Sequence, residues 1–169
     1  MADTRATAAI GGLTALLLVG ALAVQAGFVP TPWADQYGEA TVTISDESGE
    51  RLAVVQTEVA DTNRERRIGL SKHDSLDDGH GMLFVHDSEG QHTYIMPNMS
   101  FGIDIVYVGS DKRINEIHEA RKPGPNEDGG SMEYPGRGKY VLEVPKGYMA
   151  DNNVTEGDRI EIEYHGNGS

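Results

Sequence analysis

Two carboxylic acids stand within apolar runs of the sequence, where an ionised group is rarely placed without a partner. Asp104 lies near the start of the apolar run IDIVYV, and Glu143 lies in YVLEVP, on the side of its strand that faces either solvent or a cleft. Two carboxyl groups can act as general acid and base, and His118 could join them in proton transfer. A hydrolase-like enzyme that uses these three residues is therefore one hypothesis. For Asp104 the sequence favours a structural role, in which the carboxylate accepts backbone amide hydrogens from the bend at residues 97–102.

Three histidines that lie close together in the sequence are weak candidates for metal ligands. His86 and His92 flank a predicted tight turn, across which they could approach each other, and His80 lies just upstream. Imidazole groups bind zinc or copper, but the spacing matches neither HExxH nor a comparable pattern. We therefore expect surface histidines and no metal. Because the chain also lacks cysteine, a nucleotide-binding glycine pattern and a nucleophile elbow, we expect no cofactor and lean against an enzyme.

The charge of the chain narrows the class of partner. There are 27 acidic and 14 basic residues, which give a formal net charge of -13. Such a charge repels phosphate backbones, so nucleic acid is not an expected partner. The acidic excess, combined with few lysines, favours a salt-adapted surface, because high ionic strength screens the self-repulsion. An ordinary acidic protein is the alternative.

Residues 1–29 form an apolar N-terminal segment that predicts a membrane location. No charged side chain occurs between Ala6 and Val29, and about 20 apolar residues suffice to cross a bilayer. We expect an uncleaved single-pass anchor in the cell membrane that leaves the folded domain outside the cytoplasm. The alternative is a signal peptide cleaved near Ala26, followed by secretion.

The remaining chain predicts a linker at residues 30–40, a β-rich domain at residues 41–165 and a flexible tail at residues 166–169. Alternating and continuous apolar runs indicate seven or so short strands, and a Thr62–Glu65 capping box begins one of two short helices. We expect a mainly antiparallel β-barrel or a sandwich-like domain. The predicted details include a hairpin turn at residues 87–90 and a long loop, rich in proline and glycine, at residues 121–138.

Three N-x-S/T sequons occur in this predicted domain and its tail. Asn153, beside a predicted turn, and Asn167, in the tail, are accessible candidates for glycosylation if the domain is exported. We expect Asn98 to be held in the structure and to remain unmodified.

Several short motifs resemble a known family. They are RRIGL, GMLFV, IMPNMS, IDIVYV and YVLE, and their order and spacing resemble those of the domain of unknown function 192 family over residues 59–164. That family is a widespread single-domain group without an established biochemical role. Where its signature reads Phe-Trp-Met-Lys-Asn-Thr, this chain reads YIMPNM from Tyr94 to Met99, so the tryptophan and the lysine are both absent.

The sequence thus predicts a membrane-tethered or exported β-domain that binds a small polar ligand, a glycan or an envelope partner. Irregular segments on a rigid β scaffold are the usual place for recognition, so we expect the bend at residues 96–104 and the long loop to form the surface. The alternatives are the hydrolase-like enzyme and a structural envelope module without a ligand. The candidate ligand-binding residues are Met96, Asn98, Asp104, His118 and Glu143.

Overall fold

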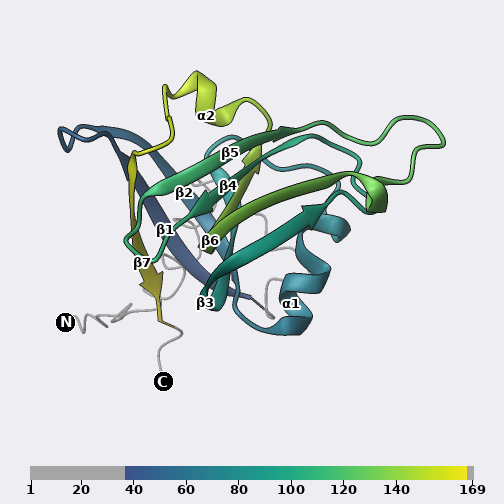
Figure 1. Ribbon diagram of the computed structural model, residues 1–169, viewed down its shortest axis with the longest axis horizontal. Coiled ribbons are helices and arrows are strands. Elements are labelled where there is room, and N and C mark those ends of the chain that lie inside the picture. The colour runs from purple at the N-terminus through teal and green to yellow at the C-terminus, as the bar shows by residue number, and fades with distance from the viewer. Residues whose placement is uncertain (1–36, 167–169) are drawn as a thin grey trace, which may run out of the picture. The chain divides into compact units, whose positions relative to one another are not determined.

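The computed structural model describes residues 37–166, whose strands all belong to one seven-stranded sheet (Figure 1). The order across the sheet is β5-β4-β6-β3-β2-β1-β7, and every neighbouring pair is antiparallel except β2 and β3. The strands are β1 (Gly38–Ser45), β2 (Arg51–Ala60), β3 (His80–Ile95), β4 (Ile103–Val108), β5 (Ile114–Ala120), β6 (Glu133–Pro145) and β7 (Arg159–His165).

The predicted N-terminal anchor, most of the linker and the sequon at Asn167 lie outside the described residues. Strand β1 begins at Gly38, within the residues assigned to the predicted linker. Among residues 37–166, no helix is both long and apolar enough to span a bilayer.

The sheet does not close into the predicted barrel, and residues 37–166 form no second sheet with which it could make a sandwich. Its two edge strands approach each other at one isolated bridge, between Arg113 and Arg159. There the amide of Ile160 donates to the carbonyl of Lys112 at 2.9 Å. Because β5 and β7 form no ladder beyond this point, the sheet is strongly curved but open.

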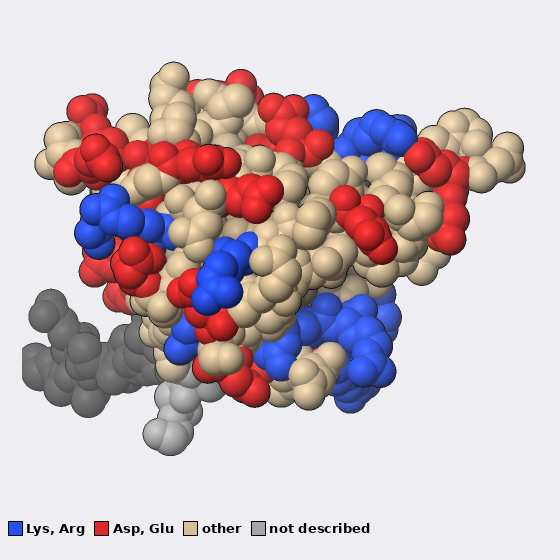
Figure 2. Space-filling model, viewed as in Figure 1, with Lys and Arg blue, Asp and Glu red and all other residues tan. Residues whose placement is uncertain are grey.

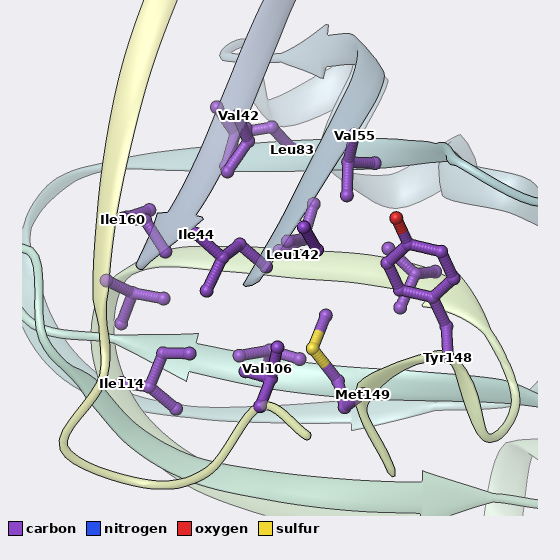
Figure 3. Close-up of a cluster of buried hydrophobic side chains, with 14 of the residues drawn as sticks. Val42, Ile44, Val55, Leu83, Val106, Ile114, Leu142, Tyr148, Met149 and Ile160 are labelled. Carbon is purple, nitrogen blue, oxygen red and sulfur yellow. The ribbon is translucent and has the colours of Figure 1, made fainter. Parts of the chain in front are cut away.

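The two faces of the sheet carry separate apolar clusters. One face holds alternate residues from most strands and is closed by Tyr148 and Met149 of the short helix α2 (Tyr148–Asp151), as Figure 3 shows. The other face is covered by helix α1 (Asn63–Ile68) and the 3₁₀ turn η3 (Gly69–Lys72), whose Leu70 packs in the second cluster. Strand β4 lies between two strands and is buried on both faces, as its continuous apolar run predicts.

The predicted hairpin at residues 87–90 is wrong, because β3 continues through it as one strand of 16 residues. Its pairing with β6 stops at Val85 and Tyr140 and resumes at Gly90 and Gly138, so residues 86–89 bulge opposite Lys139 alone.

The partner of the second half of β3 is residues 133–138, which the proline and glycine content assigned to the long loop. Gly136 pairs with His92 in this strand, and position 136 requires glycine because a Cβ atom there would overlap the ring of Tyr107. The connection between β5 and β6 is therefore restricted to residues 121–132, where the 3₁₀ turn η4 (Gly129–Ser131) packs against the bend after β3. The amide of Met96 donates to the carbonyl of Gly129 at 2.9 Å.

Candidate ligand-binding cleft

A cleft of about 720 Å³ opens between the α1–η3 segment and the bulged strand β3. Its wall on one side is the helix and the turn, and its wall on the other side is residues 91–96 with the following bend. The deepest lining residues are almost fully buried and mostly apolar. They are Leu70, Phe84, Met96, Ile103 and Glu143.

Glu143 is the one acidic side chain among these deep residues. It lies on β6 between Met82 of β3 and Ile105 of β4, and it is 5% exposed. No group of residues 37–166 forms a hydrogen bond with its carboxyl. Burial raises the pKa of Glu143 to about 8, because the charged form would lose its hydration. At neutral pH the carboxyl is therefore mainly neutral and can both donate and accept a hydrogen bond.

Two stacked histidines form part of the rim. The rings of His86 and His92 lie 3.6 Å apart between centroids and 13° from parallel, and Nε2 of His86 lies 3.1 Å from the hydroxyl of Tyr94. Burial, together with the charges of His92 and Arg66, lowers the pKa of His86 to about 4. Burial likewise lowers the pKa of His92. The pair is thus neutral at pH 7 and contributes hydrogen-bonding groups rather than charge.

Two arginines of α1 also line the cleft. The capping box between Thr62 and Glu65 forms as the sequence predicts, at the start of the helix that carries both arginines. The guanidinium of Arg66 donates to the carbonyl of Val85 at 2.6 Å. Arg67 is exposed and forms no hydrogen bond or ion pair with any described residue. Figure 2 shows basic side chains gathered at the position of α1, on a face where acidic side chains predominate elsewhere.

These arginines were absent from the candidate residues drawn from the sequence. The segment NRERRIGLSK, residues 63–72, holds four basic residues and one acidic residue in a chain that is strongly acidic. This local reversal of charge was the one signal that pointed to them.

A family model described as "Uncharacterized ACR", the DUF192 family, matches residues 43–162, which is most of the chain. The chain belongs to this family. The resemblance drawn from the sequence motifs is thereby confirmed.

Two solved structures are similar to this DUF192 domain. One is a protein of Sinorhizobium meliloti 1021 described as a candidate transcription regulator, with 27% identity and a TM-score of 0.67 over 74% of this chain and 94% of that one. The other is a protein of unknown function from Novosphingobium aromaticivorans DSM 12444, with 27% identity and a TM-score of 0.63 over 79% of this chain and 99% of that one. No curated protein matches the chain.

The DUF192 domain departs from the family signature at the cleft itself. Ile95 and Pro97 occupy the positions of the missing tryptophan and lysine, and both line the cleft. At these two positions the cleft therefore lacks the aromatic and the cationic side chain of the family signature.

The structure separates the residues that the sequence proposed for a site. Met96 and Glu143 line the cleft. Asp104 pairs with Val144 while Ile105 pairs with Glu143, so alternation places the two carboxyl groups on opposite faces of the sheet. His118 shares the face of Glu143 but lies across β4 from it, with Nε2 at 2.8 Å from the carbonyl of Pro135. The three groups of the hydrolase-like hypothesis are not brought together.

Asp104 has the structural role that the sequence favours, but with different donors. Its carboxylate accepts the amide hydrogens of Gly147 at 2.9 Å and Met149 at 3.0 Å, at the start of α2, rather than amides of the bend at residues 97–102. Burial raises the pKa of Asp104, and the two amide hydrogen bonds oppose that shift.

The other candidate residues lie away from the cleft. Asn98 lies with Pro97 in a turn, has φ of 57° and does not line the cleft; its side chain is exposed rather than held in the structure as expected. The long loop contributes no lining residue either. His80 lies at the start of β3, apart from the stacked pair, and no group of three potential metal ligands occurs within residues 37–166. Asn153 is exposed after α2, where φ is 56°.

Proposed function

We propose that this DUF192 domain is a binding module for a small polar molecule that enters the cleft. The observation that carries the proposal is Glu143, a buried carboxyl that faces the cleft and has no partner among the described residues. A buried polar group without a partner costs stability, and a ligand that enters the cleft would supply the missing hydrogen bond. The volume of the cleft falls in the range of small-molecule sites rather than of flat protein interfaces.

The test is calorimetric titration of the purified full chain, in mild detergent at pH 7, with a library of small alcohols, amides, amines and carboxylic acids. Glu143→Met should weaken binding of the best compound at least tenfold, since it removes the hydrogen-bonding group and keeps the volume. Glu133→Met changes an exposed glutamate of the same strand and should leave binding unchanged. Compounds that bind both variants equally, or no binding at all, would contradict the proposal.

We also propose that the domain acts outside the cytoplasm, attached to the membrane by residues 1–29, in a salt-adapted cell. The uncharged stretch from Ala6 to Val29 and the acidic excess of the chain support this location. Protease treatment of intact cells whose outer layers have been removed should digest the domain while cytoplasmic marker proteins survive. Recovery of the intact chain in the soluble cytoplasmic fraction would contradict it, and release into the medium would favour cleavage near Ala26.

The description of the Sinorhizobium meliloti protein as a candidate regulator does not extend to this chain. A net charge of -13 opposes binding to DNA, and the basic side chains at α1 border a cleft instead of forming a continuous basic stripe.

A further inference from the structure

We propose that the cleft selects an organic carboxylate whose apolar body carries a hydroxyl group, with the carboxylate at Arg67 and the hydroxyl at Glu143. This inference rests on the proposed function and names the class of ligand. It depends on two independent observations on residues 37–166, where the cation Arg67 at the rim has no ion-pair partner and the acid Glu143 at the base has no hydrogen-bond partner.

The rim of the cleft attracts anions although the chain as a whole repels them. Arg66 and Arg67 both line the cleft, and Arg67 has no ion-pair partner among the described residues. Glu65, the acid between Arg64 and Arg66, is held by the backbone amides of Asp61 and Thr62 at 3.2 and 3.0 Å. Asp87 is the one acidic side chain on the rim. A guanidinium without a partner presents several donors in a plane, which suits a carboxylate.

The base of the cleft suits an apolar body with one neutral polar group. Phe84, Met96 and Ile103 are at most 1% exposed and offer no hydrogen bond from their side chains. Glu143 stands beside them in its neutral form at pH 7, so it can donate to a hydroxyl oxygen or accept a hydroxyl hydrogen. A ligand with an ammonium group at this depth would first have to pass the two arginines, which disfavour a cation.

The test uses three matched sets of probes with about four to ten carbons. They are ω-hydroxy carboxylates, the carboxylates without the hydroxyl, and ω-hydroxy amines of the same lengths. Calorimetric titration of the full chain in mild detergent at pH 7 should show binding of at least one hydroxy carboxylate. The plain carboxylate of equal length should bind about tenfold more weakly, because Glu143 remains unpartnered. The amines should not bind measurably.

Two arginine variants provide the matched control. Arg67→Gln should weaken binding of the hydroxy carboxylate about tenfold, since it removes a charge-assisted hydrogen bond. Arg64→Gln makes the same change of charge on the same helix, but Arg64 does not line the cleft, so it should change the affinity less than twofold. Equal losses in the two variants would overturn the assignment of the carboxylate to Arg67.

The pH dependence tests the position of the hydroxyl. Affinity for the hydroxy carboxylate should fall as the pH rises through about 8, where Glu143 ionises and repels the anion, and Glu143→Gln should remove that fall. Binding of amines in preference to carboxylates, with loss in Glu143→Met, would overturn this inference and leave the proposed function standing. Absence of binding by all three sets, together with a failed compound library, would overturn both.

Discussion

Replacing Glu143 with methionine is expected to stabilise the protein by roughly 2 to 4 kcal/mol at pH 7.5. Burial raises the pKa of Glu143 from 4.5 to about 8, so the folded state keeps a proton that the unfolded chain has released. The wild type therefore loses stability as the pH rises from about 4.5 to about 8. Below that window both states are protonated and the loss disappears. Methionine has similar volume and no charge, so the gain should be small at pH 4 and full at pH 8.

The measurement is urea unfolding of the wild type and Glu143→Met at a series of pH values between 4 and 8. Glu133→Met serves as the control, because residue 133 is exposed on the same strand and the change should add no gain in this window. A gain for Glu143→Met that does not vary with pH would show that packing, and not the proton, causes it. A loss of stability would mean that the carboxyl has a stabilising partner in the folded protein.

The combination of higher stability and lost binding would distinguish a binding group from a folding group. Replacing a well-packed core residue lowers the free energy of unfolding of the protein. Replacing a buried polar group whose hydrogen bond is made only with a ligand is expected to raise it. Glu143 has no partner among the described residues and lies at the base of the cleft, so its replacement tests this distinction directly.

The features that could be predicted from the sequence are those set by neighbouring residues. The capping box joins Thr62 and Glu65, which are three positions apart, and it forms as expected. The continuous apolar run of β4 indicated burial on both faces, and alternation along β6 correctly placed Glu143 away from its apolar neighbours. In each case the pattern that carries the information lies within one element.

The features that could not be predicted depend on segments far apart in the chain. Residues 90–95 continue β3 because residues 133–138 pair with them. The glycines of that segment serve close packing rather than a turn, since Gly136 lies against the ring of Tyr107 and Gly138 lies against the backbone of Val108. The open sheet likewise follows from where β5 and β7 come to lie. For Glu143, alternation left open whether the side chain faces solvent or a cleft, because the answer depends on the α1–η3 segment that covers it.

Asp104→Ala is expected to destabilise the protein by about 2 to 4 kcal/mol. Asp104 is fully buried and accepts two amide hydrogens, from Gly147 and Met149, so alanine would leave two donors without a partner at the start of α2. Tyr148 and Met149 close the apolar cluster drawn in Figure 3, and loss of the anchor should loosen both. Asp104→Asn keeps one acceptor oxygen and should cost about half as much.

Urea unfolding gives the free energy, and hydrogen exchange at the amides of Gly147 and Met149 should report the local loss before global unfolding. Asp151→Ala removes an exposed aspartate from the same helix and should change the stability by less than about 0.5 kcal/mol.

Because Asp104 faces away from the cleft, Asp104→Asn should retain the binding that Glu143→Met loses. Equal loss of binding in these two variants would mean that the opposite faces of the sheet act as one site. If Asp104→Asn retains ligand binding and Glu143→Met loses it, then Asp104 serves folding and Glu143 serves ligand binding.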